Sequence, residues 1–383
     1  MHAVVIGAGA FGGWTALFLR RLGWRVTLID AWGAGNSRAS SGGETRIIRS
    51  IYGDDRTSVR LAARSLALWK EHEQRWRKTL YVRTGMLFLA EKDDSFLVES
   101  QAALADENIN FENLSAAEAS RRFPQASFEN IGSVLFEPEA GALSARENCR
   151  TVVEHFVGQG GEVITAAASR PSVKNGRAIL QLTSGDSLQA DMYVFACGPW
   201  MGQLFPDVIG PLIQPTRQEV LFFGTPPGDV SFNADVMPCW ADRTSKLKFY
   251  GIPSIQNRGF KLASDLRGPA FDPNAEDRAV QPSTIAAVRE YLRHRFPKLA
   301  DAPLVESRVC QYENSPDLGL IIDRHPEAAN VWLIGGGSGH GYKHGPAVGE
   351  YIAGRIASET APSSQFGLNR FTNQGTAWKS STI

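Results

Sequence analysis

The sequence predicts a two-domain protein of α/β plus α+β class. Three observations support this class. A strand, a glycine-rich turn and a helix follow one another at the N-terminus, helices and strands alternate again between residues 144 and 196, and longer strands with little helix follow residue 212. At 383 residues the chain also exceeds what one hydrophobic core usually spans. We therefore expect a Rossmann-like domain and a discontinuous second domain built on an antiparallel or mixed sheet.

The N-terminal segment has the spacing of a dinucleotide-binding turn. Apolar residues 3–6 lead into Gly7, Gly9 and Gly12, and a second apolar strand ends in Asp30. Gly7 allows a sharp turn, Gly9 lets the backbone approach a pyrophosphate, and Gly12 lets the helix pack on the strand. Asp30 is then placed to accept hydrogen bonds from ribose hydroxyls. This pattern indicates a dinucleotide cofactor and leaves open whether it is NAD or FAD.

Composition narrows the class of partner. The chain carries 40 basic and 40 acidic residues, which argues against a nucleic-acid or polybasic membrane role and favours a small-molecule partner. No apolar run approaches a membrane span and an apolar strand begins at residue 3, so we expect no membrane segment, no signal peptide and a cytoplasmic location. The cysteines are too scattered for a disulfide framework or a zinc site, and no metal is expected. They are Cys149, Cys197, Cys239 and Cys310.

Two arginines lie in the polar segment that follows. Arg46 and Arg49 stand close together after a glycine-rich loop, and guanidinium groups grip carboxylate or phosphate oxygens in pairs. The segment is therefore either an anion-binding site or an ordinary solvated basic turn. A helix is expected over residues 57–78, where Trp69 and Trp76 share one apolar stripe and are assigned to the core.

The middle of the chain leaves the first domain and returns to it. Strands near residues 80–82 and 86–89 and a helix from about residue 95 form a first pass through the second domain. Helix–strand alternation then resumes, and a strand over residues 192–196 ends at the run 197–200, at an edge where such sheets bind ligands. The other elements expected here are a capped helix from Ser115 that stops before Pro124, a helix over residues 144–157, and strands over residues 162–165 and 178–182.

A second glycine-rich run, residues 335–341, bears on the choice of cofactor. It leads into a helix opened by Pro346, and it is followed by Lys343. A helix N-terminus and a lysine stabilise the negative charge that a reduced flavin carries near N1 and C2=O. The run therefore favours FAD, with a plain glycine-rich turn as the alternative. The second domain's remaining elements are expected as strands over residues 219–223, 247–251 and 260–263 and a helix over residues 283–295.

Five ordered blocks resemble the flavin-dependent amine oxidases typified by monomeric sarcosine oxidase, with N-methyltryptophan oxidase and pipecolate oxidase as relatives. The blocks are the fingerprint from Gly7, residues 43–49, residues 250–253 with Lys261, residues 310–312 with 315–317 and 321–323, and residues 338–343. The resemblance covers nearly the whole chain and implies two discontinuous lobes. These are an FAD-binding domain of residues 1–80, 143–212 and 317–383, and a substrate or catalytic domain of residues 81–142 and 213–316.

The resemblance also implies how the cofactor is held. Cys310 falls where the family attaches its flavin through a thioether at the 8-methyl position, although a small buried cysteine is the plainer interpretation. FAD, covalent through Cys310, is therefore the expected cofactor. The other implied contacts are Gly7, Gly9, Ala10, Phe11, Gly12, Asp30, Ala31, Ser41, Gly42, Thr45, Arg46, Val163, Ala196, Gly198, Trp200, Gly337, Gly339, His340, Gly341, Tyr342 and Lys343.

The same resemblance assigns catalytic roles. Arg49 and Lys343 match the pair that grips the substrate carboxylate, and Tyr250 and Tyr312 match hydroxyls that line the substrate cavity. Lys261 falls on the lysine that activates oxygen over the flavin, with an ordinary solvated lysine on a strand as the alternative. Arg46 matches an arginine beside the flavin ring.

Two positions depart from the family. Asp265 and Gly42 stand where relatives often have histidine. An acid at the substrate face would attract an additional cationic group, or it would pair with the nearby Arg267. The identity of the substrate is therefore left open.

The reaction implied is oxidation of a secondary or N-methylated amino acid by transfer of a hydride equivalent to flavin N5. The imine product hydrolyses, and O2 reoxidises the flavin to give H2O2. One alternative is a dehydrogenase of the same fold that uses another electron acceptor. Another is a non-catalytic flavin-binding subunit, which would not need Arg49, Lys343 and Lys261. The partners expected are an amino-acid substrate and O2, for a monomer or small homo-oligomer.

Overall fold

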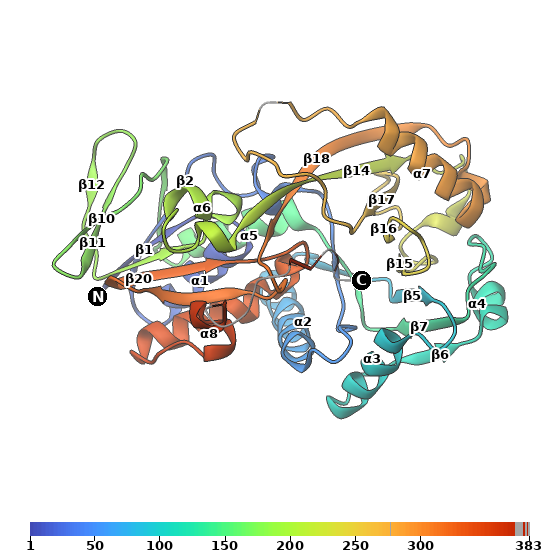
Figure 1. Ribbon diagram of the computed structural model, residues 1–383, viewed down its shortest axis with the longest axis horizontal. Helices are drawn as coiled ribbons and strands as arrows, with labels where there is room; N and C mark the ends of the chain where they lie inside the picture. Colours follow the sequence, from blue (N-terminus) through green and yellow to red (C-terminus); the bar gives the residue numbers. More distant parts are fainter. Residues whose placement is uncertain (276, 372–377, 380, 382–383) are drawn as a thin grey trace.

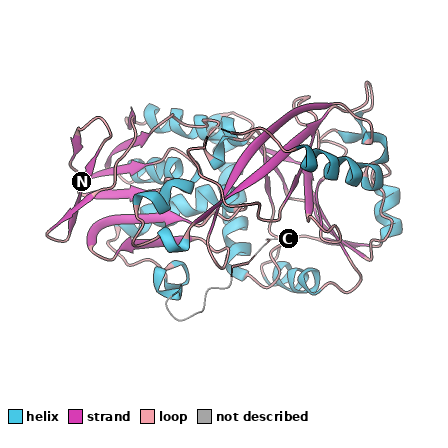
Figure 2. Cartoon of the chain, turned by 45° about the horizontal axis from the view of Figure 1, so that its top comes forward, coloured by secondary structure: helices cyan, strands magenta, loops and turns pink. Residues whose placement is uncertain are grey.

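The computed structural model describes residues 1–275, 277–371, 378–379 and 381, which form two sheet-based units (Figure 1). Figure 2 shows the strands gathered in two groups, with helices around both. This arrangement confirms the predicted α/β plus α+β class. Among the described residues, no helix has both the length and the apolar character that a membrane crossing requires.

The first unit is built on a six-stranded sheet with the order β19-β20-β13-β1-β2-β9. Its neighbours pair in parallel, apart from β19, which runs antiparallel to β20. The strands are β1 (His2–Ile6), β2 (Arg25–Asp30), β9 (Glu162–Thr165), β13 (Met192–Phe195), β19 (Ile321–His325) and β20 (Ala328–Gly335).

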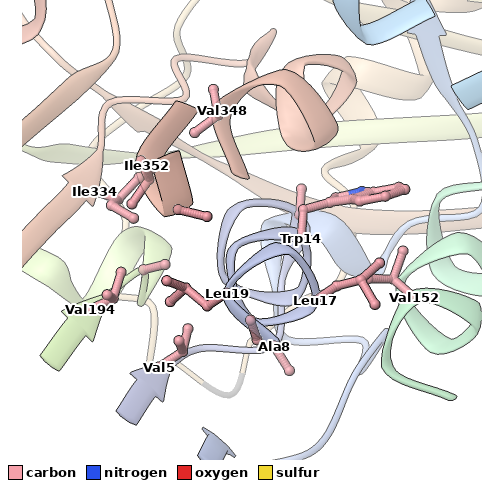
Figure 3. Close-up of a cluster of buried hydrophobic side chains, with 14 of the residues drawn as sticks. Val5, Ala8, Trp14, Leu17, Leu19, Val152, Val194, Ile334, Val348 and Ile352 are labelled. Atoms are coloured by element: carbon pink, nitrogen blue, oxygen red, sulfur yellow. The ribbon is translucent and has the colours of Figure 1, made fainter. Parts of the chain in front are cut away.

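Strand β1 shows why both faces of this sheet are covered. Its side chains alternate, so Ala3 and Val5 point into a core shared with helices, whereas Val4 and Ile6 point into a second core on the other face. Figure 3 shows the first core, where Leu19 of a helix lies among residues of the strands and of a second helix. The helices that contribute to it are α1 (Ala10–Arg21), α2 (Arg56–Trp76), α5 (Ala145–Gly158) and α8 (Gly345–Ala357).

The tryptophans of α2 belong to this core, as predicted. Trp69 and Trp76 are 1% and 9% exposed. The Trp14 ring meets Trp69 edge-on at 5.1 Å between centroids and stacks on Trp76 at 5.6 Å. The predicted helix over residues 57–78 ends at Trp76 instead, because Arg77 adopts a left-handed conformation with φ 52°.

The glycine turn between β1 and α1 requires its glycines. Gly7 has φ +102°, which side-chain-bearing residues rarely adopt. A Cβ at Gly12 would lie 1.9 Å from the Gly7 carbonyl oxygen. The predicted role of Gly12 in close helix–strand packing is therefore confirmed.

The second unit is built on an eight-stranded sheet with the order β18-β14-β17-β16-β15-β5-β7-β6. Neighbours pair antiparallel, apart from the parallel pair β15 and β5. The strands are β5 (Met86–Ala90), β6 (Glu112–Leu114), β7 (Ser133–Glu137), β14 (Gln214–Phe223), β15 (Cys239–Asp242), β16 (Phe249–Ile252), β17 (Phe260–Ser264) and β18 (Leu304–Asn314). The helices are α3 (Ser95–Asp106), α4 (Ala116–Arg122) and α7 (Pro282–Arg295).

The two faces of β14 have different neighbours. Leu221 and Phe223 pack in a core that includes Val288 and Leu292 of α7. Phe222, between them in the chain, points to the opposite face. On that face lie Tyr250 and Cys310, which line the cavities described below.

Two small sheets complete the fold. One has the order β3-β8-β4, and the other, β10-β11-β12, lies at the outer end of the first unit (Figure 1). Every strand of the six-stranded sheet falls within the segments assigned to FAD binding, and every strand of the eight-stranded sheet within those assigned to catalysis. The domain boundaries themselves stay a prediction. The remaining elements are β3 (Arg46–Ile48), β4 (Tyr81–Arg83), β8 (Gly141–Leu143), β10 (Ser172–Lys174), β11 (Arg177–Gln181), β12 (Ser187–Leu188) and α6 (Met201–Leu204).

Candidate cofactor and active site

A cavity of about 380 Å³ opens at the ends of the parallel strands β1, β2 and β13. This is the edge at which open α/β sheets bind ligands. Most of the cofactor residues expected from the sequence line it. They are Gly7, Gly9, Ala10, Phe11, Asp30, Ala31, Ser41, Arg46, Ala196, Gly198, Trp200, Cys310, Gly337, Gly339, Gly341 and Tyr342.

One end of this cavity is shaped for a nucleotide. Helix α1 begins after Gly9, and its positive dipole end suits a pyrophosphate. Its first N–H group, that of Ala10, donates to the Ser41 hydroxyl at 3.1 Å. Asp30 accepts hydrogen bonds from the N–H groups of Ala8 at 2.8 Å and Trp32 at 2.9 Å, and burial raises its pKa. Trp32 and Trp200 face each other across 5.1 Å between ring centroids. At this end of the cavity, a nucleotide would therefore find contacts for its phosphates, its ribose hydroxyls and its base.

Several expected cofactor residues lie outside the larger cavity. Val163 is 38% exposed on the edge strand β9 and does not reach it, because the cavity wall is formed after that strand, by residues 166–168. Gly42 accepts hydrogen bonds from Arg146 through its carbonyl oxygen. The Thr45 carbonyl accepts from Lys261 at 2.9 Å. Gly42 and Thr45 therefore act through the backbone, whereas His340 and Lys343 line a second cavity.

The sequence did not reveal every residue of the larger cavity. Its lining also contains Trp32, Asn36, Ala166, Ala167, Ala168, Asn274, Gln311 and Glu313. Glu313 was detectable in principle, since it is an acid at the end of a strand that carries Cys310 and Tyr312. No feature of the sequence marks the three alanines as residues of a cavity.

Cys310 differs from the other cysteines in its surroundings. Its Sγ lies 3.5 Å from the Arg46 guanidinium and faces the larger cavity. Cys149 and Cys239 are fully enclosed, and burial raises the pKa of each thiol to about 12. Cys197 also lines the cavity, but burial raises the pKa of its thiol well above the usual range. Cys310 is therefore the cysteine beside a fixed positive charge.

The second, smaller cavity of about 50 Å³ collects the expected catalytic side chains. All five line it: Arg49, Tyr250, Lys261, Tyr312 and Lys343. It shares part of its wall with the larger cavity, and the shared residues are Arg46, Tyr312, Gly339 and Tyr342. The two cavities therefore adjoin at these four residues.

Arg49 is a buried arginine, so the solvated-turn interpretation is wrong for it. Its side chain is 4% exposed, and its guanidinium carbon lies 4.4 Å from the Tyr52 ring centroid and 5.0 Å from that of Phe88. The guanidinium also donates to the Ile51 carbonyl oxygen. Aromatic faces on both sides hold its fork in one orientation.

Lys343 lies in the same cavity and is 4% exposed. Its ammonium donates to the Tyr52 hydroxyl at 2.9 Å and to the His340 carbonyl at 3.2 Å. Burial, and next the charge of Arg49, lower the pKa of Lys343 well below its usual value. An anion bound between Arg49 and Lys343 would relieve this repulsion.

The hydroxyl of Tyr52, which the sequence did not identify as a site residue, contacts several side chains beside the smaller cavity. The Tyr52 oxygen lies 3.1 Å from His340 Nδ1 and 2.8 Å from His344 Nε2. His340 Nε2 pairs with the Leu318 carbonyl at 2.9 Å, so it carries the proton and Nδ1 accepts from Tyr52. Burial lowers the pKa of both histidines well below the usual value, which keeps them neutral. Tyr52 therefore donates once and accepts from Lys343 and His344.

Lys261 is 2% exposed, so the solvated-lysine interpretation is also wrong. It lies on β17, and its ammonium donates to the Thr45 carbonyl at 2.9 Å. Burial, and next the charge of Arg46, lower the pKa of Lys261 to about 7. This lysine can gain or lose its proton near neutral pH.

The opposite wall holds two tyrosines and an acid. The hydroxyls of Tyr250 and Tyr312 are 3.4 Å apart, and burial raises the pKa of Tyr250 to about 12. Asp265 also lines the cavity, and its Oδ2 lies 3.8 Å from the guanidinium of Arg267. The predicted pairing of these two residues is confirmed. Because Arg267 also lies 5.2 Å from the Tyr312 ring centroid, this ion pair belongs to the cavity wall.

Known proteins place the chain in a family. A model of the family described as FAD dependent oxidoreductase matches residues 2–355. The chain is 31% identical over 355 residues to monomeric sarcosine oxidase of Bacillus sp. (strain B-0618), which covers 91% of this chain and 90% of that protein. It is 27% identical over 376 residues to N-methyl-L-tryptophan oxidase of Salmonella arizonae, with 96% and 98% covered.

A solved structure gives the same answer for the fold. The L-proline dehydrogenase from P. horikoshii matches with a TM-score of 0.86 at 19% identity, and 99% of each chain is covered. Together with the sequence relatives, this confirms the resemblance that the five blocks predicted. The chain therefore belongs to the FAD-dependent oxidoreductase family, as a relative of the sarcosine and N-methyltryptophan oxidases.

Proposed function

We propose that the protein oxidises the C–N bond of a secondary or N-methylated amino acid to an imine, with O2 as the electron acceptor and H2O2 as the product. One observation carries the proposal. The smaller cavity, which holds Arg49, Lys343 and Lys261, shares its wall with the larger cavity, which has the lining expected for FAD. The two cavities would bring substrate and cofactor into contact.

The residues of the larger cavity fit FAD. The turn from Gly7 and the start of α1 would hold the pyrophosphate, and Asp30 would hold the ribose. Arg46 and Cys310 would lie beside the flavin ring. Bound there, FAD would accept a hydride equivalent from the substrate and pass its electrons to O2.

Arg49 and Lys343 would hold the substrate carboxylate. Both side chains are buried, and both cationic groups lie against the ring of Tyr52. Charge-assisted hydrogen bonds from a desolvated guanidinium and ammonium favour a carboxylate strongly. A carboxylate fixed there would orient the amine end of the substrate toward the shared wall, with Tyr250 and Tyr312 on the other side.

Lys261 would serve the oxygen reaction. Electron transfer to O2 creates negative charge in a partly dehydrated space, and a fixed ammonium stabilises that charge where water cannot. Lys261 is buried and tied to the Thr45 carbonyl, so its charge is held in place. This residue favours an oxidase over a dehydrogenase.

A thioether between Cys310 and the flavin 8-methyl group is part of the proposal. Cys310 lines the cavity, and its Sγ lies 3.5 Å from the guanidinium of Arg46, beside the expected position of the flavin ring. The expected site residues stay predictions, as do the cytoplasmic location and the monomeric or small homo-oligomeric state.

Asp265 bears on the choice of substrate. It lies on the cavity wall, where its carboxylate pairs with Arg267 and accepts a hydrogen bond from the Ser381 hydroxyl at 3.0 Å. An acid there favours substrates that carry a second cationic group beyond the reacting amine. We therefore expect sarcosine, which has none, to be a weaker substrate than a basic secondary amino acid.

Anaerobic mixing of the flavin-loaded protein with a panel of secondary amino acids tests the function. Bleaching of the flavin absorbance by these compounds, followed by O2 uptake and H2O2 release on aeration, is the expected result. Bleaching without O2 uptake would indicate a dehydrogenase. No bleaching by any secondary amine would favour a non-catalytic flavin-binding subunit.

A further inference from the structure

Glu313 is a buried carboxyl group on the wall of the larger cavity. It lies one residue before the end of β18, it is 6% exposed, and it lines the cavity together with Cys310 and Tyr312. Its Oε1 atom has no hydrogen-bond partner among the described residues. A buried polar atom without a partner is costly, and a ligand bound against this wall of the cavity would offer the carboxyl group a partner.

The position of this carboxyl group is fixed by the second glycine run. The Ser338 N–H donates to the Glu313 carbonyl at 2.8 Å, which ties the end of β18 to that run. A Cβ at Gly335 would lie 2.5 Å from Glu313 Oε1, so glycine is needed there to leave room for the carboxyl group. Burial raises the pKa of Glu313 to about 8, although the N–H groups of Gly336 and Gly337 act in the opposite direction. At neutral pH the group is therefore mostly protonated and offers both a donor and an acceptor.

Its neighbours place Glu313 between two parts of the cofactor site. Gly337 lies beside Phe11 of the first glycine turn, since a Cβ at Gly337 would be 3.7 Å from the Phe11 ring. Along β18, Cys310 is three residues away from Glu313, a separation of about 10 Å at the usual rise of a strand. A cofactor would be held at the turn by its pyrophosphate and at Cys310 by its flavin ring. The ribityl chain that joins these two groups would then pass Glu313.

FAD has two groups rich in hydroxyls, the adenosine ribose and the ribityl chain, with the pyrophosphate between them. The larger cavity is lined by two carboxyl groups, Asp30 and Glu313. Asp30 accepts a hydrogen bond from the Ala8 N–H of the first glycine turn. We propose that Glu313 is a cofactor-binding residue that hydrogen-bonds the ribityl hydroxyls of FAD, as the counterpart of Asp30 at the ribose.

The chemistry selects hydroxyls over phosphate at this position. A hydroxyl both donates and accepts, so it satisfies Glu313 in either protonation state. A phosphate only accepts, and it would repel the ionised carboxylate. Arg46 is the one basic residue among the described residues that line the cavity, and it is already bound to backbone oxygens and to Cys310. The inference rests on membership of the FAD-dependent family and not on amine oxidation.

Titration of FAD into flavin-free protein tests the proposal. The Cys310→Ser background is used for all variants, because binding is then reversible whether or not the wild type forms a thioether. Glu313→Leu, close in size but apolar, is expected to raise the Kd for FAD roughly ten- to a hundredfold. Glu313→Gln keeps a donor and an acceptor and is expected to change the Kd less than about fivefold. Glu306→Leu, on the same strand but outside the cavity, is the matched control and should leave the Kd unchanged.

FAD analogues that lack one ribityl hydroxyl, at the 2′, 3′ or 4′ position, separate a direct contact from a structural effect. The Cys310→Ser protein is expected to bind at least one of these analogues roughly three- to tenfold more weakly than it binds FAD. This difference in affinity between FAD and the analogue should vanish when Glu313→Leu is added. Should Glu313→Leu fail to fold, Glu313→Ala supplies the same comparison. The proposal is overturned if the variant binds FAD as tightly as the parent, or if it loses affinity equally for FAD and all three analogues.

Discussion

The ammonium of Lys343 lies 2.9 Å from the Tyr52 hydroxyl, although the two residues are 291 positions apart in the chain. The same hydroxyl contacts His340 and His344, so one oxygen fixes three side chains from the second glycine run and the helix after it. Tyr52 also faces the Arg49 guanidinium through its ring. The tyrosine thus positions both members of the expected carboxylate clamp.

Tyr52→Phe tests this positioning. The change keeps the ring under Arg49 but removes the hydroxyl that Lys343, His340 and His344 all contact. We expect a loss of about 1 to 3 kcal/mol in the free energy of unfolding, measured by denaturant titration. Binding of a carboxylate-bearing substrate analogue should weaken as well, measured from the change it causes in flavin absorbance.

Tyr81→Phe is the matched control for that experiment. Tyr81 is also buried and its hydroxyl is also bonded, to the Glu139 carbonyl at 2.6 Å, but the cation at its ring is Lys70 and not Arg49 or Lys343. It should lower stability without changing analogue binding. Equal effects of both substitutions on binding would show that Tyr52 has no specific part in the clamp.

Arg49→Ala tests the clamp directly. Charge-assisted contacts to a desolvated carboxylate are worth about 1.5 to 3 kcal/mol each, so binding of an amino-acid substrate should weaken roughly ten- to a hundredfold. An amine without a carboxylate should bind almost as before. If both ligands lost affinity equally, Arg49 would be supporting the fold between the Tyr52 and Phe88 rings instead.

The sequence was sufficient for the parts of this molecule that depend on local pattern. Gly7 and Gly12 are needed for a turn of one geometry, and the apolar stripes of α2 and α7 fix which face each helix buries. The resemblance then supplied Arg49, Lys261 and Lys343, which the structure brings to one cavity.

The parts that were missed depend on contacts between distant segments. Tyr52 stood directly after the arginine segment, but its partners lie near the other end of the chain. Glu313 is explained only by the glycine run that folds against β18. Val163 was expected from the resemblance, but it lies within β9, and the cavity wall is formed after that strand, by residues 166–168. No local periodicity carries that information.

Cys310→Ser tests the covalent bond. Acid-precipitated wild-type protein is expected to remain yellow and to carry the added mass of FAD, whereas the variant should give a colourless pellet. Cys197→Ser is the control, because Cys197 lines the same cavity but burial raises the pKa of its thiol well above the usual range. A colourless pellet from the flavin-loaded wild type would rule out the thioether and leave the fold unaffected.

The pH dependence of the oxygen reaction should follow Lys261. Its pKa is lowered to about 7, so the side chain is charged below this pH and neutral above it. If the charge assists electron transfer to O2, the rate of flavin oxidation should fall as the pH rises through about 7. Stopped-flow mixing of the reduced protein with O2 between about pH 5 and pH 9, roughly two units on each side of that value, measures this. A rate that increases with pH would contradict the assignment.

Lys261→Met separates oxidase from dehydrogenase. Methionine keeps much of the bulk of the side chain in its buried site but removes the charge held against the Thr45 carbonyl. Loss of one preorganised electrostatic group costs roughly a hundred- to a thousandfold in rate, so oxidation by O2 should become rate-limiting and lose its pH dependence. Reduction by substrate, measured anaerobically, should change far less, because the expected carboxylate clamp is formed by other residues. Should the variant slow reduction and leave oxidation by O2 untouched, Lys261 would be a substrate ligand, and the oxidase proposal would lose its main support among the residues of the site.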